Sequence, residues 1–230
     1  MNSEVIKKII NDEEFMPKYL DMFLDRFVYQ ALEIEGTIDK EERKKQIDDL
    51  LNGFNVIMNM SFEKISPFEI QKVGDCVNND KYSGFRKINV LPGKYANWEP
   101  VEPKKIIPEL YNLINNYYNV WNERDIFEKE ALFHIWFMRI HPFEDGNKRI
   151  GKIILNANLL KQNTPPVLID SEYTEKYYEY INNEDVKGFA HFLKAKSYQE
   201  YATLLSYYKV EKNIPINESL VNYFAEQSRH

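Results

Sequence analysis

Apolar residues recur at helical spacing over most of this chain. In residues 17–34 they fall three and four positions apart, as an amphipathic helix requires. Similar spacing predicts helices at residues 3–11, across Ile47–Ile57, and at 107–120, 126–140, 150–160, 171–182, 185–206 and 216–227. The 126–140 segment is apolar on nearly all sides, which predicts a central buried helix. Glycine is scarce, at 8 of 230 residues, so tight turns are few and an all-α fold is favoured.

One stretch departs from helical spacing. Residues 82–98 place Phe85, Val90, Tyr95 and Trp98 around a Pro92-Gly93 turn, a pattern that predicts a short β-hairpin. Prolines at positions 100, 103 and 108 then predict an extended connection. We therefore expect a helical bundle with a single hairpin.

Composition limits the classes of partner. The net charge is -6, which argues against a general nucleic-acid surface or an anionic-membrane surface. Cys76 is the single cysteine, so the chain cannot form an internal disulfide or a cysteine-based zinc site. The first 15 residues lack the apolar run of a signal peptide, and the apolar run at 131–140 is too short to span a bilayer. We expect a cytoplasmic protein without membrane association, although a protein exported by another route would share these features.

The chemistry of the sequence is concentrated in residues 141–152, which read His-Pro-Phe-Glu-Asp-Gly-Asn-Lys-Arg-Ile-Gly-Lys between two apolar segments. His141 can accept a proton near neutral pH. Asp145 offers the hard oxygen that Mg²⁺ prefers, together with substrate phosphates. Gly146 allows backbone N–H groups to approach an anion, and Asn147 can donate from its side chain or cap a helix.

Three cations complete this loop, at Lys148, Arg149 and Lys152. Arg149 and Lys152 are three residues apart, so they project from neighbouring parts of one helical face. A base, a metal ligand and an anion hole are the groups that phosphoryl or nucleotidyl transfer requires. Local positive charge in a chain of negative net charge supports the same interpretation, a site for phosphoryl or nucleotidyl transfer.

Residues 141–152 resemble the active-site motif of the Fic family, His-x-Phe-x-(Asp/Glu)-Gly-Asn-Gly-Arg-x-x-Arg. Gly84-Phe85-Arg86 with Val90 resembles the start of the Fic flap, a hairpin over the active site, and 106–110 resembles the segment after it. Pro165-Pro166-Val167 ends a helix as in family members. The resemblance covers roughly residues 60 to 200. It implies an N-terminal helical region at 1–60, a Fic catalytic core at 61–200 and a helical extension at 201–230.

The family's usual activity is transfer of AMP from ATP to a Ser, Thr or Tyr hydroxyl of a target protein. By position, the resemblance implies that His141 is the base and that Asp145 holds Mg²⁺ or Mn²⁺. It implies that nucleotide phosphates meet Gly146, Asn147, Lys148, Arg149 and Lys152. The flap residues Ile88, Asn89, Val90 and Leu91 would align the target by main-chain pairing. Self-modification and homodimerisation are both compatible with the resemblance.

Two residues depart from the family motif. Lys148 stands where most members have glycine, and Asn-Lys-Arg is the form of the Doc-like branch, whose members resemble kinases. Lys152 replaces the second arginine, which keeps the charge but loses the bidentate fork. Two alternatives to an adenylyltransferase therefore stay open: a Doc-like protein kinase that transfers the γ-phosphate, and a catalytically weak regulatory protein on a Fic scaffold.

A second motif lies before the catalytic core. Glu35-Gly36, with Ala31 four residues earlier, resembles the Fic inhibitory motif (Ser/Thr)-x-x-x-Glu-(Gly/Asn). In the family this glutamate pairs with the second arginine and blocks the γ-phosphate, so here its partner would be Lys152. The resemblance implies autoinhibition from an N-terminal helix, and removal of AMP is a further activity of some members.

Overall fold

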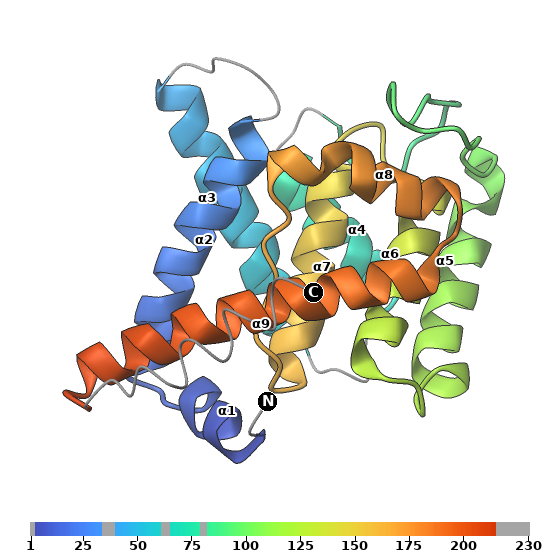
Figure 1. Cartoon of the computed structure of the whole chain (residues 1–230). Helices are drawn as coiled ribbons and strands as arrows, with labels where there is room; N and C mark the ends of the chain where they lie inside the picture. The colour runs from blue at the N-terminus through green and yellow to red at the C-terminus, as the bar shows by residue number, and fades with distance from the viewer. Residues whose placement is uncertain (1–2, 34–39, 61–64, 79–81, 215–230) are drawn as a thin grey trace.

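The computed structural model describes residues 3–33, 40–60, 65–78 and 82–214, and within these ranges all regular secondary structure is helical. Figure 1 shows the arrangement. The helices are α1 (Ser3–Ile10), α2 (Phe15–Glu33), α3 (Lys40–Met58), α4 (Pro67–Asn78), α5 (Ile106–Asn115), α6 (Ile126–Ile140), α7 (Asn147–Lys161), α8 (Thr174–Asn182) and α9 (Val186–Glu211), with single turns η2 (Pro103–Lys105), η3 (Asn116–Val120) and η4 (Ser171–Tyr173). The predicted all-α fold is confirmed. The helix predicted at 216–227 lies outside the described residues.

Helices α6 and α7 form the centre of the bundle. α6 packs against α5, α7 and α9, and α7 packs against α3 and α4 on its other side, while α9 crosses the front of the view in Figure 1. Gly151 to Leu160 of α7 are buried without exception. Its polar residues are therefore paired inside the core: the Asn156 amide exchanges two hydrogen bonds with the backbone of Val167, at 2.6 and 3.1 Å. The single apolar face predicted for 150–160 is a helix buried on all sides.

Helix α4 was not predicted. Gly74 interrupts its apolar pattern, and the helix is short. Its start carries a signal nevertheless, because Pro67 occupies the first helical position and Ser66 and Glu69 have the spacing of a capping box, with the Ser66 hydroxyl donating to the Glu69 carboxylate. Gly74 has a packing role, because a Cβ there would lie 2.2 Å from Cε1 of Phe143.

The predicted β-hairpin is not formed. Residues 82–102 contain bends and a turn at Gly93, whose φ is 104°, but no strand. Leu91 is 91% exposed and Ile88 58% exposed, so the segment has no apolar face that would fix a strand register. It is instead held to the core by Arg86 and Trp98, both buried. Among the described helices, none is long and apolar enough to cross a membrane.

Candidate functional site

The loop between α6 and α7 is shaped by two residues with left-handed backbone conformations. His141 (φ 51°, ψ 61°) ends α6, and Gly146 (φ 76°) precedes the first turn of α7. A side chain at position 146 would also meet the Asn78 amide oxygen at 2.6 Å. Position 146 therefore requires glycine, both for its backbone conformation and for lack of space. The loop leaves the N-terminus of α7 available to a ligand.

Phe143 and Asn147 lock the loop from within. The Phe143 ring is fully buried and fills the notch left by Gly74. The Asn147 side chain accepts from the Phe143 backbone N–H at 3.0 Å and donates to the Phe143 carbonyl at 2.8 Å. The Asn147 amide therefore closes the loop through these two bonds. A contact between Asn147 and an anion, as the sequence predicts, would come from its position at the start of α7 rather than from a free side chain.

Arg86 supports the loop from behind. Its side chain is 2% exposed and donates to the carbonyls of His141 (2.7 Å), Ile88 (2.9 Å), Ile140 (3.3 Å) and Val101. Its backbone N–H donates to Pro142 at 3.0 Å. One side chain thus joins the end of α6 to both ends of the 86–101 segment.

The imidazole of His141 is neutral at physiological pH. Burial lowers its pKa to about 4, and the nearby Arg86 charge acts in the same direction. Nδ1 is buried, and the Met138 backbone in the last turn of α6 acts against these two effects by raising the pKa. Nε2 is therefore the ring nitrogen available to a ligand, and it can accept a proton.

Asp145 and Arg149 form an ion pair across the first turn of α7. Arg149 Nη2 lies 3.1 Å from Asp145 Oδ2, and the other carboxylate oxygen accepts from the Gly146 N–H at 2.6 Å. The Asp145 side chain is 55% exposed, so an oxygen can reach a ligand. No group of three metal-ligating side chains occurs among the described residues. A single exposed carboxylate nevertheless fits Mg²⁺, which is commonly held by one or two carboxylates and the substrate's phosphates.

These residues line one cavity of about 260 Å³. Larger cavities lie elsewhere, but this one is lined by the charged and proton-accepting residues of the motif. It brings together most of the residues that the motif predicts: His141, Asp145, Gly146, Asn147, Lys148 and Arg149. From the flap, Leu91 lines the cavity with Pro92 and Gly93, whereas Ile88, Asn89 and Val90 do not.

Lys152 does not line this cavity. Its ammonium group is buried and donates to the Ile169 carbonyl at 3.0 Å, and burial together with the charge of Lys148 lowers its pKa to about 7. Glu35, the predicted inhibitory residue, lies outside the described residues. The expected pairing of Glu35 with Lys152 is therefore a prediction only.

Tyr178 is a lining residue that sequence reasoning missed. Its ring stacks on Trp98 at 6.1 Å and lies 5.7 Å from the Tyr95 ring, so α8 is tied to the flap segment beside the cavity. An aromatic wall in a cavity with cations suits a nucleobase next to its phosphates. The signal in the sequence was the pair Tyr177-Tyr178. Tyr177 packs into the core, and Tyr178 reaches the edge of the cavity.

Comparison with known proteins agrees with the motif. Residues 59–159 match the Fic/DOC family model. Protein adenylyltransferase fic-1 of Caenorhabditis briggsae is 24% identical over 201 residues, covering 84% of this chain and 35% of that protein. Protein adenylyltransferase Fic of Nematostella vectensis is 39% identical over 69 residues, covering 29% of this chain and 16% of that protein. The chain thus spans about a third or less of the length of these relatives.

Solved structures show the same fold. A Fic domain-containing signaling protein of Bacteroides thetaiotaomicron matches with a TM-score of 0.75 at 18% identity, over 94% of this chain and all of that one. Fic-1 of C. elegans, residues 134–508, matches with a TM-score of 0.68 at 16% identity, over 93% of this chain and 72% of that one.

Proposed function

We propose, on the premise that residues 59–159 form a Fic/DOC family domain, that this protein is a protein adenylyltransferase that moves AMP from ATP to a hydroxyl of a target protein. The observation that carries the proposal is the shared cavity. A neutral histidine, an exposed carboxylate and an arginine line it together with the N-terminal turn of α7. Relatives named as protein adenylyltransferases support the same reaction class.

His141 is the general base in this proposal. Its Nε2 takes the proton of the attacking Ser, Thr or Tyr hydroxyl as the oxygen bonds to the α-phosphorus of ATP. The bond from that phosphorus to the bridging oxygen breaks, and pyrophosphate leaves. Burial lowers the pKa of His141 to about 4, so the ring is unprotonated at neutral pH and the Nε2 lone pair is free to take the hydroxyl proton.

The phosphates are bound by the start of α7. The backbone N–H groups after Gly146 and the guanidinium of Arg149 supply positive potential where negative charge gathers. Mg²⁺ or Mn²⁺, held by Asp145, would neutralise phosphate charge when ATP is bound. Lys152 would meet the γ-phosphate only after leaving the Ile169 carbonyl.

The flap aligns the target in this proposal. Ile88 and Leu91 are exposed apolar side chains on a segment without strand pairing. An extended target segment that pairs with the main chain of 88–91 would gain hydrogen bonds and a cover for these side chains. We also keep the division into an N-terminal region (1–60), a catalytic core (61–200) and an extension (201–230) as a proposal, with α9 continuing through position 200.

Autoinhibition by Glu35 is a further part of the proposal. Its support is the docking of α2, the helix before it. Gln30 of α2 donates to the Asp170 carboxylate, and Asp170 follows Ile169, the residue whose carbonyl holds Lys152. A carboxylate a few residues beyond Gln30 would compete with phosphate for the same cation.

Labelled ATP tests the proposal. The Glu35→Gly variant is incubated with a cell extract and with α-labelled or γ-labelled ATP, and the matched control carries Glu35→Gly and His141→Ala. We expect His141-dependent protein labelling from α-labelled ATP and an AMP adduct by intact mass. Label from the γ-position alone would identify a kinase, and no His141-dependent label from either would indicate a regulatory protein.

The kinase is the second candidate because of Lys148. It lines the cavity where most family members have glycine, next to the phosphate-binding turn. A lysine there adds bulk and charge and can reverse the sense in which ATP binds. Lys148→Gly should then raise labelling from the α-position relative to the γ-position.

A further inference from the structure

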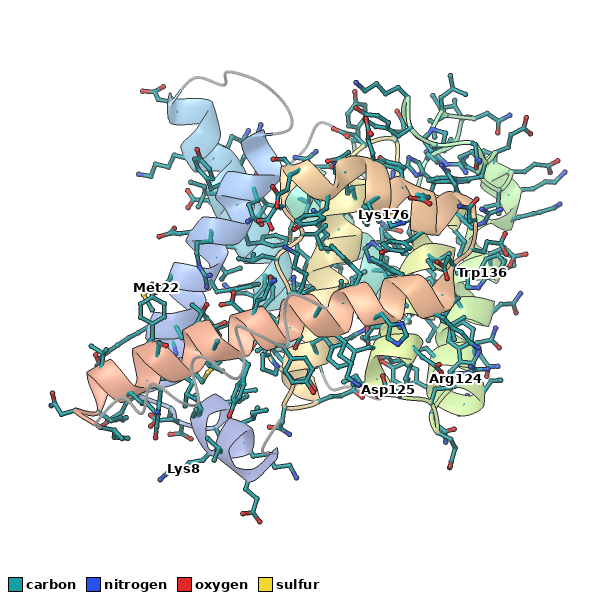
Figure 2. All side chains as sticks on the ribbon, viewed as in Figure 1. Lys8, Met22, Arg124, Asp125, Trp136 and Lys176 are labelled. Atoms are coloured by element: carbon teal, nitrogen blue, oxygen red, sulfur yellow. The ribbon has the colours of Figure 1, made fainter. Side chains whose placement is uncertain are left out.

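A second cavity shares no lining residue with the active-site cavity. It has a volume of about 560 Å³ and is formed by α5, α6 and the 99–101 segment. We call it the tryptophan groove, defined by Trp121, Trp136, Glu99, Glu109, Arg139 and Ile140. Figure 2 labels Trp136 at the right of the view, where α6 approaches the start of α9. None of these residues belongs to the motif at 141–152.

The aromatic surface of the groove is open. Trp136 is 39% exposed, which is unusual for the largest apolar side chain, and Trp121 is half-buried. Tryptophan is one of the residues enriched among those that contribute most to binding at protein interfaces.

The charge of the groove is negative. Arg139 is already neutralised, because it forms an ion pair with Glu184 at 3.0 Å and donates to the Ile181 carbonyl at 3.3 Å. Glu99 and Glu109 have no hydrogen bond or ion pair with any described residue. Two unpaired carboxylates beside two indole rings therefore remain to be matched by a partner.

We propose that the tryptophan groove binds an arginine side chain of a partner protein. A guanidinium ion stacks on an indole face and satisfies carboxylates with the same planar group. The groove already contains one such contact, since the Arg139 guanidinium lies 5.9 Å from the Trp136 ring and 6.0 Å from the Trp98 ring. An acidic side chain would meet Glu99 and Glu109, and a neutral one would leave both unpaired.

The groove is coupled to the active-site loop by its position. Ile140 and Val101 line the groove, and the carbonyls of both accept from Arg86, which also donates to the His141 carbonyl. A partner held here would lie against the support of the loop. The identification of that partner with the target of modification rests on the proposed function, whereas arginine binding does not.

Acetyl-arginine-amide is the probe, and the indole N–H signals of the three tryptophans are the readout, assigned by single Trp→Phe variants in ¹⁵N-labelled protein. We expect saturable shifts of Trp121 and Trp136 but not of buried Trp98. The Glu99→Gln/Glu109→Gln variant should bind at least about tenfold more weakly. Glu172→Gln/Glu175→Gln, which removes the same charge from exposed residues outside the groove, should bind as wild type does.

The inference is overturned by the absence of a saturable shift with the arginine probe, by equal shifts with acetyl-glutamine-amide, or by full binding of the Glu99→Gln/Glu109→Gln variant. Tighter binding of acetyl-glutamate-amide would assign the groove to acidic partners through Arg139 and would also overturn it. The titration is repeated with the His141→Ala variant, which should bind the probe unchanged. The result is thereby separate from any failure of AMP transfer.

Discussion

Replacing Arg86 by methionine removes the guanidinium that joins the flap segment to the active-site loop. The side chain is 2% exposed and donates to four backbone carbonyls, two of which, those of Ile140 and His141, are at the end of α6. Helix-end carbonyls have no intrahelical partner, so the variant leaves them buried and unsatisfied.

Each such carbonyl costs about 1–3 kcal/mol when it loses its donor. Part of that cost is offset because Arg86 has no carboxylate partner among the described residues, and burial alone lowers its pKa. Arg86→Met should therefore lower the free energy of unfolding by about 2–4 kcal/mol. For a domain of this size each kcal/mol corresponds to about 2–4 °C, which predicts a Tm lower by roughly 4–16 °C.

Urea unfolding followed by circular dichroism measures this change, with Lys87→Met as the matched control. Lys87 is exposed and adjacent, so its loss should change stability by less than about 0.5 kcal/mol. Arg86→Lys should fall between the two, because an ammonium group keeps the charge but cannot reach carbonyls on several sides. An Arg86→Met protein within about 1 kcal/mol of wild type would refute the role of Arg86 as the support of the loop.

Three further predictions concern the loop and its neighbours. Gly74→Ala should cost about 1–3 kcal/mol of stability, since its Cβ would lie 2.2 Å from the Phe143 ring, and adding Phe143→Leu should restore part of it in a double-mutant cycle; additive losses would disprove the clash. Lys152→Met should leave Tm unchanged or higher, because it removes a buried charge held by a carbonyl, yet weaken ATP binding at least about tenfold by calorimetry; unchanged affinity would remove Lys152 from the phosphate site. Folding lowers the pKa of His141 from 6.5 to about 4, so the native state binds this proton less tightly than the unfolded state does. Wild-type stability therefore falls as the pH drops from 6.5 to 4. His141→Gln should flatten that fall by about 3 kcal/mol at most, and identical pH profiles would contradict the burial argument.

Helical spacing was sufficient for most of the fold because it reports which residues are buried. It predicted α2, α6 and α9 within a few residues, and the apolar character of 126–140 identified the central helix. The same argument misjudged α7, for which it predicted one apolar face that leaves Asn156 and Asn158 outside the core. Both are buried and hydrogen-bonded, to Val167 and to Glu130, and no local pattern indicates partners 11 and 28 residues away.

The flap shows a different limit. A turn was predicted at Pro92-Gly93, and the structure has one slightly later, at Lys94-Tyr95, where the Ala96 N–H donates to the Gly93 carbonyl. A turn between apolar residues predicts a hairpin only if the flanking segments pair with each other. Here Arg86 donates to carbonyls at both ends of the segment, and Trp98 packs on Tyr178, so the chain is held by side chains rather than by a strand ladder. These contacts depend on α6 and α8, which the sequence of 82–98 does not contain.

Motif spacing predicted which residues of 141–149 line one cavity, while their roles stay predictions, and it did not predict the position of Lys152 or of Tyr178. Motif spacing put Lys152 on the same face as Arg149, yet Lys152 is buried against Ile169 and Arg149 lines the cavity beside Asp145. Helical spacing determines in which direction around the helix axis a side chain points, but not how close a neighbouring segment packs against it. The irregular segment 167–170 after α7 determines whether the Lys152 side chain reaches solvent or a backbone carbonyl.

Backbone carbonyls hold two basic side chains around the active-site loop, those of Arg86 and Lys152. Neither makes an ion pair with a carboxylate in the described part of the chain, and burial lowers the pKa of Lys152 to about 7, so its amine is only partly protonated at neutral pH. Burying a cation in this way is costly, and a polyphosphate beside the loop would relieve the cost for any cation that can reach it. In a protein with a net charge of -6, this local excess points to a polyanionic ligand more directly than any single motif residue does. The same excess explains how a glutamate near Lys152 could inhibit, since it would supply the missing negative charge without ATP.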